Sequence, residues 1–167
     1  MTVYETRFGS LDSYEKGRVE VIDDDPKRYV FSNVFEVASR AKPYEKVVVA
    51  TNLEYVLEAI RAEGASEWRV ANHDESALVL DGEVRVSLVK VPAELVPAEG
   101  VDGSVGLDGE PAGAAMGCIV ARRGHMALLP AGAAYRFEAD VPSVILQQTI
   151  RGDGSVERWA EIIQTHV

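Results

Sequence analysis

Alternation of apolar and polar positions is the main pattern of this chain, and it predicts strands. The clearest instance is residues 77–80 and 83–89, two runs of aliphatic and β-branched residues with Asp81 and Gly82 between them. Asp-Gly is the preferred sequence of a two-residue hairpin turn, because both of its residues adopt a positive φ. These residues therefore predict a β-hairpin.

A second hairpin is predicted further along the chain, from residues 118–121 to residues 125–129 across an Arg-Arg-Gly turn. Residues 134–138 and 143–148 predict two more strands, and residues 46–50 predict a buried one. Several short strands at this spacing are typical of an antiparallel barrel or sandwich.

The patterns elsewhere in the first 65 residues are more mixed. Residues 18–22 alternate and predict a strand, while residues 29–31 and 34–37 are rich in aromatic and β-branched residues, as strands are. Residues 53–63 fit one face of a helix, yet their second half, from residue 57 to the glycine at position 64, also fits a strand. We favour the strand, because of a motif described below.

The chain of 167 residues is expected to form a single domain, residues 1–167, with three less regular parts. Residues 1–16 are polar and weakly patterned, and they predict an N-terminal arm. Residues 92–117 hold six glycines, three prolines and five acidic residues without a basic one, which predicts a long loop. A short C-terminal helix is predicted over residues 155–164, with a serine at its start and one apolar face.

Composition and charge exclude several function classes. The chain has 17 basic and 27 acidic residues, a net charge of −10, and such a surface repels nucleic-acid phosphates and anionic lipids. No apolar run is long enough to span a membrane, and the N-terminus does not resemble a signal peptide. Cys118 is the single cysteine, so no intrachain disulfide can form. We expect a cytoplasmic protein with neither nucleic-acid nor membrane partners.

Two spaced sets of residues resemble the two sequence motifs of the cupin superfamily. The glycine, glutamate and closing glycine of the first motif correspond to Gly64, Glu75 and Gly82, and the second motif corresponds to Gly124, Pro130 and Gly132. The resemblance implies an all-β fold, a cupin-type antiparallel β-barrel of jelly-roll-like form. It also favours a strand just before Gly64.

The cupin metal ligands are mostly missing. In metal-binding cupins two histidines and the glutamate of the first motif, together with a histidine of the second, hold the ion. The histidine positions here fall on Arg69, Ala71 and Tyr135, and only Glu75 is retained. These residues do not supply the neutral nitrogen donors that Fe(II), Mn(II) or Zn(II) use, and Arg69 adds a positive charge. We expect no metal ligand, no cofactor site and no catalytic residue in this chain.

His73 leaves an alternative open. On a regular strand it points to the same side as Arg69 and Glu75. With His125 as a third donor, His73 and Glu75 would form a shifted metal site of two imidazoles and one carboxylate. Otherwise His73 and Glu75 hydrogen-bond inside the barrel and Arg69 neutralises the carboxylate. His166, next to the C-terminus, is expected to be a solvated tail residue.

Five polar residues are candidates for lining a pocket inside the barrel: Arg69, His73, Glu75, Tyr135 and Gln147. An arginine beside a tyrosine hydroxyl recognises a carboxylate or a phenolate, and a His–Glu pair can act as a base and its orienting group. These residues predict a stand-alone cupin that binds a small molecule as an alternative function. The same five side chains also fit simple polar filling of the barrel.

Over nearly its full length the chain is similar to the small subunit of the two-component, iron-dependent hydroquinone 1,2-dioxygenases. The similarity is carried by residues 21–26, 31–39, 73–75, 124–130 and 157–161. It implies a ring-cleaving dioxygenase in which a larger cupin subunit holds Fe(II) and the small subunit has degenerate metal positions. This chain would then be the metal-free partner of that larger subunit, in a heterotetramer, or a homodimer in isolation. The arm and the loop 92–117 would lie at the interface, or else form a frayed end and a solvated loop.

Overall fold

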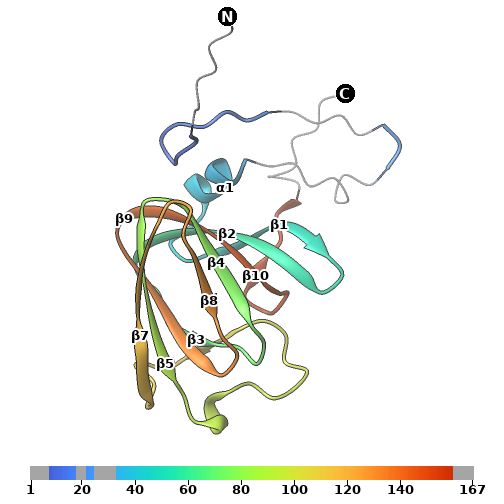
Figure 1. The fold of residues 1–167 in the computed structure, drawn as a ribbon. Coiled ribbons are helices and arrows are strands. Elements are labelled where there is room, and N and C mark those ends of the chain that lie inside the picture. Colours follow the sequence, from blue (N-terminus) through green and yellow to red (C-terminus); the bar gives the residue numbers. More distant parts are fainter. Residues whose placement is uncertain (1–7, 18–21, 25–32, 160–167) are drawn as a thin grey trace, which may run out of the picture.

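The structure is a computed structural model that describes residues 8–17, 22–24 and 33–159. In these residues the chain forms one curled, almost entirely antiparallel sheet with a short helix at one end (Figure 1). The all-β fold expected from the sequence is confirmed. No helix in the described parts is long and apolar enough to cross a membrane. The helix α1 (Val34–Arg40) and the 3-10 turn η2 (Ala93–Leu95) accompany the strands β1 (Lys46–Asn52), β2 (Tyr55–Ala65), β3 (Trp68–Val70), β4 (Glu75–Asp81), β5 (Glu83–Lys90), β6 (Val105–Leu107), β7 (Ala114–Arg122), β8 (Met126–Leu129), β9 (Ala133–Ile150) and β10 (Ser155–Val156).

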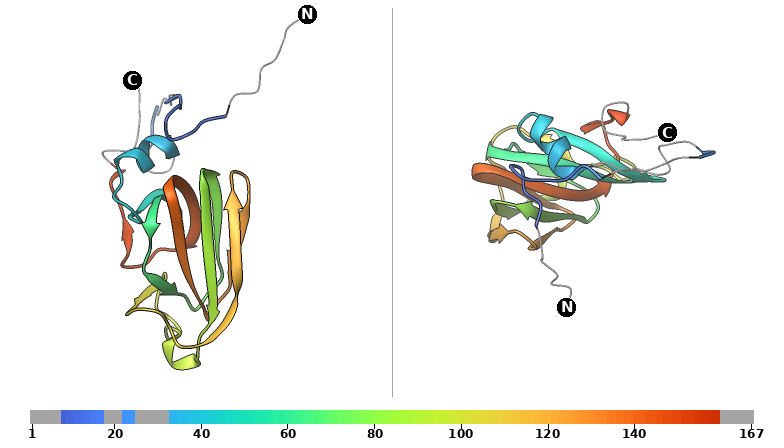
Figure 2. Two further views of the ribbon diagram at one scale, coloured as in Figure 1. Left: turned by 90° about the vertical axis from the view of Figure 1, so that its left-hand side faces the viewer. Right: turned by 90° about the horizontal axis from the view of Figure 1, so that it is seen from above.

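The long strand β9 joins the two halves of the barrel. Its N-terminal part pairs with β3 and β5, and its C-terminal part pairs with β2 and β4. β6 and β7 extend the first half, while β1, β8 and β10 extend the second. Figure 2 shows the two halves facing each other, with α1 next to β1 and β2. The two strands predicted over 134–138 and 143–148 are thus parts of one strand.

The two predicted hairpins are wrong in their pairing. β4 pairs with β8 and β9, whereas β5 pairs with β7 and β9, so the strands on either side of Gly82 are not partners. The same holds for β7 and β8. At Gly82 the chain instead passes from one half of the barrel to the other. Gly82 has a φ of +75° and lies against Ser143 of β9, whose hydroxyl accepts a hydrogen bond from the Glu83 N–H at 3.2 Å.

Residues 34–37, with a strand-like composition, begin a helix instead. The Asn33 side chain caps the helix by accepting hydrogen bonds from the N–H groups of Phe35 (3.0 Å) and Glu36 (3.3 Å). Val37 and Ala41 then pack against the outer side of β1 and β2. This cap and this burial outweigh the local β propensity.

The predicted loop 92–117 contains more regular structure than expected. It includes η2 and β6, and β7 begins at Ala114. The apolar side chains Leu95, Val96 and Val105 pack over the outer side of β3 and β5. Their burial against the sheet fixes the segment in spite of its glycines and prolines.

The helix predicted over residues 155–164 is wrong at its start. Ser155 and Val156 form β10, which pairs in parallel with β1. Residues 160–164 lie outside the described residues, as do residues 1–7, most of the predicted strand 18–22, residues 29–31 and His166. The strands predicted for 46–50 and for the residues leading to Gly64 are confirmed as β1 and β2.

The barrel interior is apolar at one end and polar at the other. Val79, Val84, Phe137 and Ile145 belong to the apolar cluster. Toward the other end, β2 and β9 turn carboxylate and amide side chains inward. This polar end holds the residues that sequence reasoning singled out.

Candidate functional site

Seven polar side chains meet at the polar end of the barrel interior, and we call them the polar cluster. Cross-strand partners share one side of a sheet, and the register pairs Glu58 with Gln147 and Arg69 with Tyr135. The polar cluster consists of Lys46, Glu58, Arg69, Glu75, Ser104, Tyr135 and Gln147.

Gln147 links Glu75 on β4 to Tyr135 on β9 within the polar cluster. Its buried Nε2 donates to Glu75 Oε1 at 3.0 Å and to Tyr135 Oη at 3.1 Å. The hydroxyl groups of Tyr135 and Ser104 share a further hydrogen bond of 3.1 Å. The structure therefore brings three predicted pocket residues into direct contact, and they fill the interior with their own hydrogen bonds.

Ser104 connects the basic side chains to this network. Its Oγ accepts hydrogen bonds from Lys46 Nζ (3.0 Å) and Arg69 Nε (2.9 Å). Arg69 also donates to the Ser104 carbonyl and pairs with Glu67. Arg69 thus joins the cluster through Ser104. The alternative from the sequence, in which Arg69 neutralises Glu75, is not what the structure has.

Lys46 and Glu58 form a buried ion pair, with 3.6 Å between Nζ and Oε2. Burial lowers the pKa of Lys46, and the charge of Glu58 works in the opposite direction. Burial likewise raises the pKa of Glu58, against the effects of Lys46 and of a 2.5 Å hydrogen bond from Ser155 Oγ. Burial and the neighbouring Glu75 raise the pKa of Tyr135, so this side chain stays a neutral phenol.

Sequence reasoning missed Lys46, Glu58 and Ser104. Lys46 and Glu58 carried a signal, because each is a charged residue on the inward side of a strand that is otherwise apolar. Ser104 carried none, since it lies 31 residues or more from the side chains it bonds. It is positioned by Gly103, whose φ is +70° and which lies against Gly152.

His73 lies at the edge of the polar cluster and has partners of its own. Between β3 and β4 the strand is interrupted, so the alternation of sides that the sequence reading assumed does not hold. His73 Nδ1 lies 3.1 Å from the Asn72 side-chain oxygen, which only accepts, so Nδ1 carries the proton. His73 Nε2 accepts from the Ile150 N–H at 3.4 Å and lies 3.1 Å from Thr149 Oγ1. The predicted His73–Glu75 pair is not formed.

His125 does not approach His73. It is exposed in the turn between β7 and β8, where its Nδ1 accepts from the Arg122 N–H at 2.9 Å. The His125 carbonyl bonds Val79, four residues along β4 from Glu75, a separation of about 13 Å on an extended strand. The shifted ligand set of His73, Glu75 and His125 is therefore not assembled.

The polar cluster does not fit a divalent metal ion. Glu75 Oε1 is engaged by Gln147, and Tyr135 is a neutral phenol. The ammonium of Lys46 and the guanidinium of Arg69 lie in the same cluster and would repel a cation. Within the described parts of the chain, no group of three or more His, Cys, Asp or Glu side chains is arranged to hold a metal.

Three buried oxygens of the cluster accept no hydrogen bond from the chain: Glu58 Oε2, Glu75 Oε2 and Gln147 Oε1. A cavity of about 10 Å³ lies against Lys46, Glu58 and Ser104. This is close to the smallest space that holds one water molecule. This cavity therefore has no room for an organic ligand.

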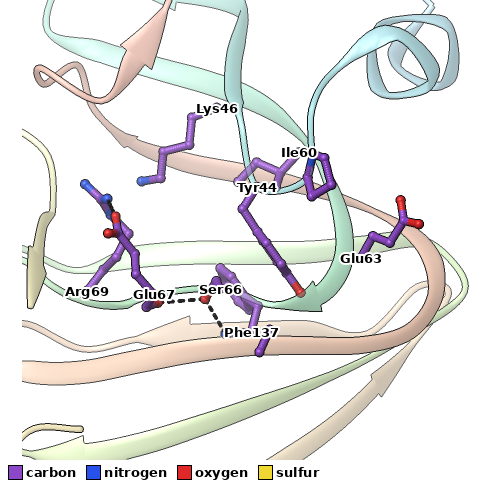
Figure 3. A pocket seen from close by; sticks show the side chains of 10 residues that line it. Tyr44, Lys46, Ile60, Glu63, Ser66, Glu67, Arg69 and Phe137 are labelled. Carbon is purple, nitrogen blue, oxygen red and sulfur yellow. Dashed lines mark hydrogen bonds and ion pairs between the residues drawn. The ribbon is translucent and has the colours of Figure 1, made fainter. Parts of the chain in front are cut away.

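A larger pocket of about 420 Å³ opens beside the polar cluster. Figure 3 shows Tyr44, Ile60 and Phe137 in its wall, with Lys46 and Arg69 toward one end. Burial raises the pKa of Tyr44 to about 12, and its hydroxyl donates to the Gly64 carbonyl at 2.5 Å. The volume suits one aromatic ring, but both cations already have acidic partners within the chain.

Two solved structures contain a chain that is similar to this one over its whole length. One is hydroquinone 1,2-dioxygenase PnpCD in complex with Cd2+ and 4-hydroxybenzonitrile, with 53% identity, a TM-score of 0.89 and 99% of both chains covered. The other is hydroquinone 1,2-dioxygenase from Sphingomonas sp. TTNP3 with 4-hydroxybenzoate bound, with 51% identity, a TM-score of 0.92 and coverage of 99% of this chain and 100% of that chain. No family model matches the chain, and no curated protein matches it.

More distant structures share the fold alone. A cupin-2 domain containing protein from Shewanella frigidimarina NCIMB 400 is 16% identical, with a TM-score of 0.50, over 70% of this chain and 89% of that one. A longer chain of hydroquinone 1,2-dioxygenase PnpCD in complex with Fe3+ is 12% identical, with a TM-score of 0.58, over 84% of this chain and 39% of that one. The barrel is a cupin fold, and the chain belongs to the hydroquinone 1,2-dioxygenase family.

Proposed function

We propose that this chain is the small, metal-free subunit of a heteromeric hydroquinone 1,2-dioxygenase and supports a longer cupin chain that holds the iron. The full-length similarity to one chain of two such enzymes carries the proposal. The longer chain of the PnpCD structure with Fe3+ has the same fold and is the model for the partner. We further propose a heterotetramer in the cytoplasm.

The chemistry of the side chains supports a role outside the reaction. Ring cleavage needs a metal with open positions, at which iron brings the aromatic diol and O2 together. In this chain the positions that correspond to cupin ligands hold Arg69, Ala71 and Tyr135, which are ion-paired, apolar and neutral respectively. The chain's own residues instead build a rigid, internally hydrogen-bonded barrel that can hold the partner in its active form.

The test is to express this chain and the longer chain separately and together. We expect hydroquinone-dependent O2 consumption only from the pair. When the two chains are separated under non-denaturing conditions, the iron should stay with the longer chain. A control pair in which the longer chain is freed of iron by a chelator should consume no O2. Turnover of hydroquinone by this chain alone, or one iron bound per isolated chain, would contradict the proposal.

A further inference from the structure

Two rows of side chains cross the outer side of the sheet from β1 to β8. Directly paired residues of neighbouring strands point to the same side, so the register defines each row. The first row consists of Ala50, Leu57, Gln148, Ser76 and Leu128. The second row consists of Val47, Ala59, Leu146, Leu78 and Met126. We call these ten residues the outer rows.

The second of the outer rows is buried at its β1 end, and both rows are exposed at β8. At the β1 end, Val47 and Ala59 lie under α1 and are fully buried. Exposure rises toward β8, where Met126 is 69% and Leu128 is 58% exposed. Large apolar side chains with this exposure, side by side on one sheet, are typical of interaction surfaces.

The outer rows carry no charge, although the chain is strongly acidic. Charged residues make up 26% of the sequence, so ten average positions would include two or three of them. None of the ten is Asp, Glu, Lys or Arg. A charged partner would lose hydration on this surface without gaining an ion pair, whereas an apolar protein surface matches it.

β8 is also the edge of this half of the sheet. Among the described residues it pairs with β4 alone, and none of their strands lies along its other side. An edge strand with exposed apolar side chains associates with other chains unless something covers it. The exposed end of the outer rows and this open edge are therefore the same place.

A hollow of about 350 Å³ adjoins the first row at its β1–β2 end, lined in part by Ala50, Tyr55, Leu57 and Gln148. Tyr55 is 49% exposed at its rim. A hollow of this kind can receive one apolar or aromatic anchor side chain, and such anchors contribute most of the binding energy at protein interfaces. The surface thus combines an apolar face with a hollow that can receive one anchor side chain.

We propose that the exposed part of the outer rows, toward β8, is the surface through which this chain binds the longer dioxygenase chain. The inference rests on the proposed function, since it takes its partner from there. Hydroquinone 1,2-dioxygenase PnpCD contains both a chain similar to this one and a longer chain with the same fold. A protein partner of that size can cover a sheet face several strands wide, which a small molecule cannot.

The test compares binding of the longer chain to wild type and to the double variant Met126→Glu/Leu128→Glu. Both side chains are exposed, so the variant should keep the wild-type circular dichroism and melting temperature. We expect its affinity for the longer chain to fall about 100-fold or more, because two carboxylates would be buried without partners. The matched control is Val120→Glu on β7, another edge strand, where Val120 is 52% exposed; it should bind within about threefold of wild type.

The outcomes separate this inference from the function on which it rests. If wild type does not bind the longer chain, the proposed function fails and the inference with it. If wild type and the double variant bind equally well, only the inference is wrong. If Val120→Glu weakens binding as much as the double variant, the location is wrong. A homodimer of the isolated chain that the double variant splits would assign the surface to a second copy and overturn the proposal.

Discussion

Ser104 brings together side chains that come from opposite walls of the barrel. Lys46 and Arg69 each donate a hydrogen bond to its hydroxyl oxygen, and the Tyr135 hydroxyl shares another hydrogen bond with it. An arrangement of an ammonium, a guanidinium and a phenol around one oxygen is what an anionic ligand would need. Here the chain supplies that oxygen itself, which closes the polar end from within.

We expect Ser104→Ala to lower the free energy of unfolding by about 2 kcal/mol, because buried charged donors lose their acceptor. Urea unfolding followed by fluorescence measures the change. Ser10→Ala is the control, since its hydroxyl accepts an exposed hydrogen bond from the Ser13 N–H, and it should cost about 0.5 kcal/mol or less. An equal, small effect of both variants would show that Ser104 does not organise the cluster.

The pH dependence of stability should report on Glu58. Burial raises its pKa in the folded state, so the folded chain keeps a proton at pH values where an unfolded glutamate, near 4.5, has released it. The folded state then binds more protons, and the free energy of unfolding falls as pH rises from 4.5 through the raised pKa. The fall is at most about 1.4 kcal/mol per pH unit for a single group.

Glu58→Gln removes this titration. Relative to the variant, wild type should therefore lose stability as pH rises above 4.5, in urea unfolding measured at intervals of pH up to neutrality. Because both proteins share all other titrating groups, their difference isolates Glu58 and its coupling to Lys46. Two parallel curves would mean that the pKa of Glu58 is the same in the folded and unfolded states, with Lys46 and Ser155 offsetting its burial.

The site was predictable where a motif fixes the strand and side of a residue. The cupin spacing placed Glu75 on β4, and the apolar runs around Tyr135 and Gln147 placed them on β9, so their meeting follows from the fold. His73 was misplaced because alternation applies only to an unbroken strand, and the chain leaves the sheet before it. Ser104 was unpredictable because its position depends on the contact of two glycine loops.

At the scale of elements, strand positions were easier to predict than strand partners. Apolar alternation is local, and it located β1, β4 and β5 within a few residues. The partner of a strand depends on which other strand of the barrel lies alongside it. The Asp-Gly sequence is the same in a hairpin turn and at Gly82, the corner where the chain passes from one half of the barrel to the other. Helix α1 was missed because its Asn33 cap and its burial on the sheet outweigh local propensity.

The corner makes a prediction with a matched control. Gly82 and Gly64 have nearly the same backbone, with φ of +75° and +74°, but a Cβ at Gly82 would lie 2.1 Å from Ser143 Oγ, whereas a Cβ at Gly64 meets nothing within 4 Å. Gly64→Ala should cost about 1–2 kcal/mol for the left-handed backbone alone. Gly82→Ala should cost at least about 1 kcal/mol more, because Ser143 must move as well. Equal effects in urea unfolding would show that the corner adjusts freely.

At the scale of the whole molecule, charge and apolar surface are distributed differently. The net charge of −10 favours solubility, whereas the outer rows contain no charged residue and expose apolar side chains at their β8 end. An acidic protein that associates through such a surface gains little from ion pairs. We expect its partner to be recognised by shape and by apolar burial. The affinity of the pair should then depend less on salt than the affinity of a complex held by ion pairs.

We therefore expect the dissociation constant of the pair with the longer chain to change less than about threefold as the salt concentration rises from about 0.05 to 0.5 M. Salt screens charges across an interface, but it leaves apolar burial almost unchanged. Isothermal calorimetry over this range measures the dependence, and the same titrations should give a negative heat-capacity change on binding, the mark of apolar burial. A tenfold or larger weakening with salt would place charged residues at the centre of the interface, and the outer rows would then lie at its margin or outside it.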